Sequence, residues 1–346
     1  MAEGMEKLVK DLRDMKALAK LVGDAPTFLE AIRSLPAVAQ NHATVLIGGE
    51  TGTGKELVAR AIHYLSPRSE FPFVPVHLGS LPDTLVEDEL FGHERGAFTD
   101  ARTQRHGMIA QADKGTLFLD EVETMSLKAQ VALLRVLQDK HFRSLGSCCE
   151  QHADIRVIAA TNAPLKELVQ AGSFRMDLYY RLCVISIQLP PLRERKEDVV
   201  SLTRHFLKKH TRADHTELQL SPAAQEALLA YDWPGNVREL ENAIIRGINL
   251  CQTKFIDVYD LGIPDRSESP TESAPGRPLA SRSFKEIKQE TITRFEMAYL
   301  NRLMREHRGN VSHAARAVGK DRRELGKMLK KYHIDPKLFY LDAVME

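Results

Sequence analysis

The sequence predicts an α/β fold built on a parallel sheet, followed by an all-α C-terminal domain. Within the first 190 residues, five short apolar segments alternate with segments of helical periodicity, a pattern typical of a parallel sheet covered by helices on both faces. After Pro190-Pro191 the apolar periodicity is helical alone, so a helical unit follows the sheet. A segment rich in Ser and Pro then separates these units from a basic, helical C-terminal segment.

Apolar runs and helical spacing place the elements of the α/β unit. Leu127, Val131, Leu134 and Leu137 recur at helical intervals, which predicts a helix over residues 127–138. We expect further helices at residues 55–64 and 165–170. We expect the five strands at residues 43–48, 73–77, 116–120, 155–160 and 184–189.

Composition divides the chain into five expected segments. Residues 265–283 are rich in Ser and Pro and can bury little apolar area, which indicates a linker. The segments are a short amphipathic N-terminal helix within residues 1–20, an α/β subdomain over 21–191, a helical subdomain over 192–263, a flexible linker over 264–284 and a helix-turn-helix domain over 285–346. We expect helix 284–306 to form the dimerising part of the last of these.

Charge and hydropathy exclude several classes of protein. The 346 residues carry 48 Lys or Arg against 47 Asp or Glu, and 43% are hydrophobic, which excludes a largely disordered chain. No apolar run reaches the ~18 residues of a membrane span, and the N-terminus has no secretory core. The four cysteines lack zinc-site spacing, so we expect reduced thiols in a cytoplasmic protein with no membrane partner.

A phosphate-binding loop follows the first predicted strand and opens the next helix. Glycines there let consecutive backbone N–H groups turn inward around phosphates, and the helix N-terminus adds positive potential. Its residues are Gly49, Glu50, Thr51, Gly52, Thr53, Gly54 and Lys55, with Lys55 reaching the terminal phosphates of a bound nucleotide. Glu56 stands where this kind of loop usually has a Ser or Thr that contacts Mg²⁺, so that contact must come from elsewhere.

Polar side chains at the ends of two further strands are expected to complete the site. Asp120 and Glu121 end the third strand, at the edge where open α/β sheets bind ligands. We expect Asp120 to hold Mg²⁺ and Glu121 to polarise the attacking water, although such a pair can also be a solvated strand end. Thr161-Asn162 ends the fourth strand and can sense the γ-phosphate or place the water.

Three arginines suit the charge that spreads during phosphoryl transfer. Arg175 and Arg181 lie just before the fifth strand, and Arg238 lies in the first turn of a helix opened by a Pro-Gly turn. Without the other motifs, ordinary ion pairs on the surface or with an acid of the helical subdomain would explain all three.

Together these segments resemble the AAA+ domain of bacterial sigma-54-dependent transcription activators. The resemblance covers about residues 21–262 and rests on GETGTGKE at 49–56, ELFGHERGAFTDA at 89–101, LPPLRER at 189–195 and WPGNVRELEN at 233–242. It implies a ring of subunits, commonly six, with ATP between protomers. It implies that Arg175 and Arg181 act on the neighbour's nucleotide, that Arg238 is the lid arginine acting in cis, and that Thr161-Asn162 is the first sensor.

The segment 96–101 corresponds to the family's sigma-54-contacting loop. It comprises Gly96, Ala97, Phe98, Thr99, Asp100 and Ala101, and an exposed Phe at a loop tip should have a partner. The alternative is a packed hairpin with Phe98 in its own core. Two residues depart from the family. Asp100 replaces a Gly, and His77 replaces an Asn thought to hold the catalytic Glu, so His77 could hydrogen-bond Glu121 in a pH-dependent way.

Residues 308–331 read as a basic helix-turn-helix similar to the Fis-type domain of this family. They hold eight Lys or Arg against two Asp or Glu, which suits phosphate contacts with double-stranded DNA. We expect Ala314, Ala315 and Val318 in the core, Gly319 in the turn and Asp321 as N-cap. The expected DNA-contacting residues are Ser312, Arg316, Lys320, Arg322, Arg323 and Lys327. A charged helical hairpin used for assembly is the alternative.

These predictions combine into an ATP-hydrolysing activator that binds an upstream DNA site and remodels sigma-54 RNA polymerase. Since no receiver or ligand-sensing domain is expected before the α/β unit, we expect control by expression level or by a separate regulatory protein acting in trans. A DNA-binding AAA+ regulator that does not act through sigma-54, because of Asp100, is the first alternative. An ATP-driven remodeller of other proteins is the second.

Overall fold

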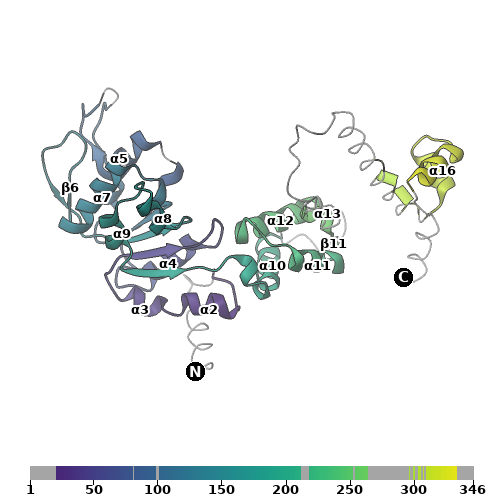
Figure 1. The fold of residues 1–346 in the computed structure, drawn as a ribbon, viewed down its shortest axis with the longest axis horizontal. Helices are drawn as coiled ribbons and strands as arrows, with labels where there is room; N and C mark the ends of the chain where they lie inside the picture. The colour runs from purple at the N-terminus through teal and green to yellow at the C-terminus, as the bar shows by residue number, and fades with distance from the viewer. Residues whose placement is uncertain are drawn as a thin grey trace. The chain divides into compact units, whose positions relative to one another are not determined.

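The computed structural model describes residues 21–80, 82–98, 101–211, 218–251, 254–263, 296, 299–300, 303–304, 307 and 309–332. The chain divides into two compact units, Met1–Glu268 and Ser269–Glu346 (Figure 1). The expected N-terminal helix, the linker and most of helix 284–306 lie outside the described residues, as do Thr99 and Asp100.

A five-stranded parallel sheet forms the centre of the first unit, which confirms the predicted fold class. Its strands are β1 (Val45–Gly48), β2 (Phe73–His77), β5 (Thr116–Asp120), β8 (Arg156–Thr161) and β9 (Ile185–Gln188), in the order β2-β5-β8-β1-β9. Register pairs His77 with Asp120 and Gly48 with Thr161, so the polar strand ends meet at one edge of the sheet.

Helices cover both faces of this sheet because alternate strand residues point to opposite sides. In β5, Leu117 and Leu119 pack into one apolar cluster with Leu133 of α7, whereas Phe118 packs into another with Ile62 of α4. The helices of the first unit's sheet region are α2 (Pro26–Ile32), α3 (Leu35–Ala39), α4 (Lys55–Tyr64), α5 (Asp83–Phe91), α6 (Met108–Gln111), α7 (Leu127–Asp139), α8 (Leu165–Gln170) and α9 (Met176–Leu182), with 3₁₀ turns η1 (Leu78–Ser80) and η2 (Val122–Thr124).

Two short hairpins project from the same unit. The strands β3 (Gly92–His93) and β4 (Arg105–His106) pair at the base of the segment that is expected to contact sigma-54. The strands β6 (His141–Phe142) and β7 (Gln151–His152) pair in the second hairpin. The backbone joins the two hairpins, because Leu145 N–H donates to Gly92 O at 2.8 Å and Glu94 N–H donates to Leu145 O at 2.9 Å.

A helical subdomain follows the sheet within the same unit. Its elements are η3 (Leu192–Glu194), α10 (Glu197–His210), β10 (Gln219–Leu220), α11 (Pro222–Ala230), α12 (Asn236–Leu250), β11 (Phe255–Ile256) and α13 (Val258–Leu261). Trp233, Phe206, Leu240 and Ile244 form its core. Across the described parts of the chain, none of the helices has the length and apolar character needed to cross a bilayer.

The described part of the second unit is a helix-turn-helix. Its helices are α15 (Val311–Ala317) and α16 (Arg322–Lys331), and Ala314, Ala315, Leu325 and Leu329 pack in one core with Leu300. Gly319 has φ of 66° in the turn, as its predicted role requires. Asp321 occupies the N-cap position of α16 as predicted, but its side chain makes no capping hydrogen bond.

Candidate functional site

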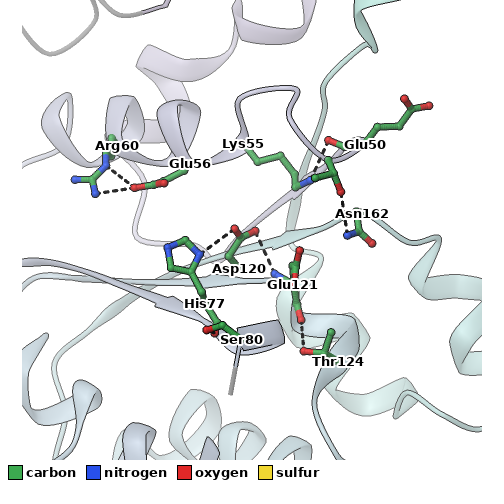
Figure 2. Close-up of polar contacts among 11 residues, drawn as sticks. Glu50, Lys55, Glu56, Arg60, His77, Ser80, Asp120, Glu121, Thr124 and Asn162 are labelled. Carbon is green, nitrogen blue, oxygen red and sulfur yellow. Dashed lines mark hydrogen bonds and ion pairs between the residues drawn. The ribbon is translucent and has the colours of Figure 1, made fainter. Parts of the chain in front are cut away.

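The glycine loop between β1 and α4 wraps around the Lys55 side chain. Lys55 is buried, and its Nζ donates to the carbonyl oxygens of Gly49 at 2.7 Å and Glu50 at 3.2 Å (Figure 2 draws the second contact). Gly52 and Gly54 adopt positive φ of 81° and 103°, conformations that L side chains rarely adopt. A Cβ on Gly52 would also overlap the carbonyl oxygen of Gly235, so this loop and the helical subdomain approach closely only because residue 52 is glycine.

The predicted acids lie at the edge of the sheet beside Lys55. Asp120 Oδ1 accepts the backbone N–H of Glu121 at 3.1 Å, and Glu121 adopts a left-handed backbone with φ of 59° (Figure 2). The side chain of Glu121 packs over Gly79, where no Cβ would fit. Both carboxylates therefore face the same space as the lysine.

His77 makes a different contact from the one expected from the sequence. Its Nδ1 lies 3.3 Å from Asp120 Oδ2, and its hydrogen bond is with Asp120 rather than with Glu121 (Figure 2). The physical reason is the register of the parallel pair, which places His77 directly opposite Asp120. The strand end therefore positions the histidine beside the first acid of the pair.

Burial and charge act on Lys55 in opposite directions. Burial lowers the pKa of Lys55, and the carboxylates of Asp120, Glu123 and Glu121 oppose that shift, in this order of strength. Glu56 points away from the loop lysine and forms an ion pair with Arg60 at 2.7 Å, four residues further along α4. The ammonium group of Lys55 thus faces a cluster of negative charge at the end of β5.

Asn162 connects the end of β8 to the segments that follow the two neighbouring strands, β1 and β5. Its Nδ2 donates to Thr51 Oγ1 at 3.4 Å, and its backbone N–H donates to Glu123 Oε1 at 3.2 Å (Figure 2 draws the first contact). Thr161 is buried, and its Oγ1 hydrogen-bonds within the turn, to Ala163 at 3.1 Å. Sequence reasoning missed Glu123, which lies outside the recognisable acid pair.

Two further residues that sequence reasoning missed fasten the helical subdomain to the glycine loop. Arg193 forms a two-point ion pair with Glu50, at 2.7 and 2.9 Å. The buried Asn236 has φ of 54°, and its Nδ2 donates to Glu50 Oε2 at 3.1 Å and to Thr51 O at 3.0 Å. Arg193 lies in the LPPLRER segment and Asn236 in the WPGNVRELEN segment. Both segments carried the family resemblance, but of their residues only Arg238 was predicted to act in the site.

One cavity of about 600 Å³ brings the predicted groups of the loop, the strand end and the helical subdomain together. It is lined by Thr51, Gly52, Gly54, Lys55, Glu56, Leu57, His77, Gly79, Ser80, Asp120, Glu121, Val237, Arg238 and Glu241. Arg238 is exposed and close enough to Lys55 for its charge to lower the pKa of Lys55. Backbone N–H groups, Lys55 and Arg238, together with the carboxylates of Asp120 and Glu121, suit a polyphosphate with a divalent cation.

An apolar cavity of about 530 Å³ adjoins it and shares Gly54 and Leu57 with it. Leu21, Phe28, Leu57 and Phe206 contribute apolar walls, and Thr53 and Gly54 of the loop line it too. A planar, mostly apolar group could pack there while its attached phosphates reach the glycine loop.

Arg175 and Arg181 lie apart from this cavity and do not line it. Arg175 forms an exposed ion pair with Asp177 at 2.7 Å, and Arg181 donates to the carbonyl oxygen of Leu137 at 2.8 Å. The structure therefore does not place either arginine beside the Lys55 of its own chain.

The segment expected to contact sigma-54 presents Phe98 at the surface. Phe98 is 41% exposed, and its ring packs edge-on against His93 at a centroid distance of 4.9 Å. Gly96 N–H donates to Ala101 O at 2.8 Å, which closes the loop, and Ala101 is buried. Thr99 and Asp100 lie outside the described residues.

Most of the predicted DNA-contacting side chains of the second unit are exposed. Arg322 and Arg323 lie in the first turn of α16, and Lys327 follows one turn later. Arg316 and Lys320 are exposed in or just after α15, whereas Ser312 is half-buried.

Comparisons with known proteins agree with this geometry. Residues 21–188 match a model described as the sigma-54 interaction domain, 193–277 match an AAA+ ATPase lid domain, and 291–332 match a bacterial regulatory protein of the Fis family. The chain is 41% identical over 317 residues to the regulatory protein AtoC of Escherichia coli, covering 91% of this chain and 68% of AtoC. It is 41% identical over 320 residues to the sigma-54-dependent transcriptional regulator SfnR of Pseudomonas fluorescens, covering 89% and 87%.

A solved structure shares the fold and most of its length. NtrX from Brucella abortus in complex with ATP aligns with a TM-score of 0.66 at 32% identity, covering 94% of this chain and 72% of NtrX. The same protein in complex with ADP aligns with a TM-score of 0.65. The chain belongs to the family of sigma-54-dependent transcriptional regulators, which combine a sigma-54 interaction domain, an AAA+ lid and a Fis-type helix-turn-helix.

Proposed function

We propose that this regulator hydrolyses ATP and uses the reaction to remodel sigma-54 RNA polymerase while its C-terminal domain is bound to an upstream DNA site. The observation that carries the proposal is the cavity that joins Lys55, Asp120, Glu121 and Arg238 around the glycine loop. The solved relative with bound ATP supports nucleotide binding by this fold.

The loop and the helix behind it would bind the phosphates of ATP. Gly52 and Gly54 let the backbone N–H groups of the loop gather at the N-terminus of α4, where the helix dipole favours negative charge. Lys55 would leave the carbonyl oxygens of Gly49 and Glu50 and reach the terminal phosphates. The apolar cavity beside Phe28 and Leu57 would take the adenine base.

Asp120 fits the protein ligand of a magnesium ion bound together with ATP. In the part of the chain that the structure describes, no cluster of three metal-ligating side chains exists. Mg²⁺ in nucleotide sites usually takes only one or two protein carboxylates plus phosphate oxygens and water, so a single carboxylate at this edge suits it. When bound, the ion would neutralise charge on the phosphates.

Glu121 is the general base of the proposal, since its carboxylate lies beside Asp120 and lines the same cavity. Asn162 lies at the end of the adjacent strand, in contact with Thr51, and would sense the γ-phosphate or orient the water. Arg238 would stabilise the nucleotide from the helical subdomain of the same chain.

Arg175 and Arg181 would complete the site of a neighbouring subunit in a ring, commonly a hexamer in this family. Their positions outside the cavity of their own chain support action in trans. Guanidinium groups stabilise the charge that spreads over the transferred phosphoryl group.

The loop of Gly96, Ala97, Phe98, Thr99, Asp100 and Ala101 would contact sigma-54. The support is the exposed Phe98 and the match of residues 21–188 to the sigma-54 interaction domain. Arg322 and Arg323, with Ser312, Arg316, Lys320 and Lys327, would bind double-stranded DNA. We also propose that a separate regulatory protein controls the chain in trans.

The test is ATP-dependent open-complex formation by purified sigma-54 RNA polymerase on a sigma-54 promoter that carries the regulator's binding site. We expect opening with ATP, none with a non-hydrolysable analogue, and none with Phe98→Ala, which should still hydrolyse ATP. Hydrolysis without opening by the unaltered chain would contradict the proposal and favour a regulator that does not use sigma-54. Restoration of opening by Asp100→Gly would then identify the altered loop as the cause.

A further inference from the structure

A third carboxylate, outside the acid pair, contacts the turn that carries Asn162. Glu123 lies on η2, and its Oε1 accepts the backbone N–H of Asn162 at 3.2 Å. Its Oε2 is buried, and no described residue donates a hydrogen bond to it. Glu123 is therefore held at one oxygen by the turn that carries the proposed sensor.

Through this contact, a bridge crosses three neighbouring strands of the sheet. In the strand order β2-β5-β8-β1-β9, β8 lies between the strand of the acids and the strand of the glycine loop. Glu123 follows β5, Asn162 follows β8 and Thr51 follows β1. The Glu123–Asn162 contact of 3.2 Å and the Asn162–Thr51 contact of 3.4 Å together link the three strand ends.

Stability does not explain why a carboxylate occupies this position. Asn162 is exposed, so water can satisfy its N–H without a protein acceptor. A third negative charge close to Asp120 and Glu121 also costs repulsion, and an unpartnered buried carboxylate oxygen costs desolvation. Features that cost stability in this way are concentrated at functional sites.

The charge of Glu123 acts on Lys55. Among the carboxylates that hold up the pKa of Lys55 against burial, Glu123 acts more strongly than Glu121. The side chain of Glu123 therefore lies within electrostatic range of the phosphate-binding lysine.

We propose that Glu123 is a positioning residue for ATP hydrolysis, which holds the Asn162 backbone so that the Asn162 amide stays beside Thr51 of the phosphate-binding loop. The proposal rests on the function proposed above. Glu123 would not touch the phosphates itself. Because Glu123 holds the backbone N–H of Asn162, the side-chain amide of Asn162 stays in one orientation at the γ-phosphate position. The amide then does not have to be reoriented in each turnover.

The test is steady-state ATP hydrolysis by the full chain. Glu123→Ala is expected to lower kcat by about tenfold or more, in the range typical of supporting residues, because the Asn162 turn is released. KM for ATP should change by less than about threefold, since Lys55 and the loop N–H groups remain in place. Glu123→Gln keeps an oxygen acceptor for the Asn162 N–H and should recover most of kcat. Glu167→Ala, which removes an exposed carboxylate on α8, is the matched control and should match the unaltered chain.

A double-mutant cycle separates positioning from a general structural role. If Glu123 acts through Asn162, Glu123→Ala should cost little in an Asn162→Ala background, so the two losses in kcat should be far from additive. Full additivity, or an unchanged kcat for Glu123→Ala, would overturn the assignment. A Glu123→Gln variant as slow as Glu123→Ala would also overturn it, in favour of a purely electrostatic role. Absence of turnover in the unaltered chain would instead overturn the proposed function.

Discussion

Glu50 of the glycine loop and Arg193 at the start of the helical subdomain form a two-point ion pair. Arg193 Nη2 lies 2.7 Å from Glu50 Oε1, and Nη1 lies 2.9 Å from Oε2. The two residues are 143 positions apart in the sequence. The pair therefore holds the helical subdomain, the lid, directly against the loop that would bind phosphates. A nucleotide that moves this loop would therefore also move the lid.

We expect Arg193→Ala to weaken the coupling between lid and loop. Both side chains are about 40% exposed, so the pair should contribute only weakly to folding. A double-mutant cycle of Glu50→Gln and Arg193→Ala, measured by urea unfolding at pH 7, should give a small but measurable favourable coupling free energy. A coupling free energy of zero would show that the ion pair is incidental.

The same cycle should depend on pH. Hydrogen bonds from Arg193 and Asn236 lower the pKa of Glu50 below its ordinary value. A carboxylate with a lowered pKa in the folded state contributes its stability above the unfolded pKa, and that contribution is lost as pH falls through the folded pKa. The coupling free energy should therefore be constant from pH 6 to pH 8 and decline only in acid, below the ordinary range of a glutamate.

Asn236 should matter more for stability than its exposed neighbours. It is fully buried, its Oδ1 accepts the Leu192 N–H at 2.7 Å, and its Nδ2 reaches Thr51 O and Glu50. Asn236→Ala would leave the Leu192 N–H and the Thr51 carbonyl without their partner, and alanine tolerates the positive φ of this position less well than asparagine does. We expect a loss of about 2–4 kcal/mol in the free energy of unfolding.

Asn236→Gly separates the two causes of this loss. Glycine tolerates the observed φ of 54° but also lacks the amide, so it should recover only the backbone part. Asn236→Asp keeps an oxygen that accepts the Leu192 N–H and hardly changes the size of the side chain. It should nevertheless lower the free energy of unfolding, because it places a carboxylate against Glu50. Equal stability of all three variants and the unaltered chain, in denaturant titrations, would contradict this account.

The elements could be predicted from the sequence because their signals are local. Apolar runs placed β2 and β5 at their observed bounds, and helical spacing after the glycine loop placed α4 from Lys55 to Tyr64. The end of β1 was also right, whereas its start was placed two residues early, because Ala43 and Thr44 extend the run without belonging to the strand. Strand order was beyond this reasoning, since it depends on which crossover follows which strand.

Motifs in the sequence singled out residues that the structure brings together, whereas contacts that depend on the tertiary fold alone were missed. Lys55, Asp120 and Arg238 share one cavity, as their motifs suggested. Glu123 was missed because its partner Asn162 lies 39 residues further along the chain. His77 was paired with the wrong carboxylate because the choice between Asp120 and Glu121 depends on strand register, which the sequence does not state.

Mixing subunits should test whether Arg175 acts on a neighbour. Arg175→Ala is expected to abolish turnover, because arginines that act in this way contribute about a thousandfold or more. Lys55→Ala should also abolish turnover, because it removes the phosphate contact in its own chain. An equimolar mixture should recover part of the turnover, since a boundary can then combine an intact Lys55 with an intact Arg175. Arg135→Ala, an exposed arginine on α7, is the control. No recovery on mixing, with both variants assembled, would contradict action in trans.

Arg322 and Arg323 should be needed for DNA binding but not for hydrolysis. They lie in the exposed first turn of α16, where recognition helices usually reach base edges. Replacing both by Ala should weaken the binding free energy by about 1–3 kcal/mol for each arginine that reads a base, and should leave the ATPase rate unchanged. Footprinting and salt-dependent binding assays measure the effect, with Arg135→Ala plus Lys166→Ala as a control of equal charge. Undiminished sequence-specific binding would favour a C-terminal unit used for assembly.

Glu121→Gln should separate ATP binding from ATP hydrolysis. The substitution keeps the size of the side chain above Gly79 but removes the base, so turnover should fall by about 100-fold or more. Lys55, the loop N–H groups and Asp120 remain, so the affinity for ATP should stay within a few-fold of the unaltered chain. Equilibrium titration with a fluorescent ATP analogue and single-turnover hydrolysis measure the two quantities on the same preparation. Asp120→Asn is the comparison, because loss of the proposed magnesium ligand should weaken both. A Glu121→Gln variant that hydrolyses ATP at the normal rate would remove Glu121 from the mechanism.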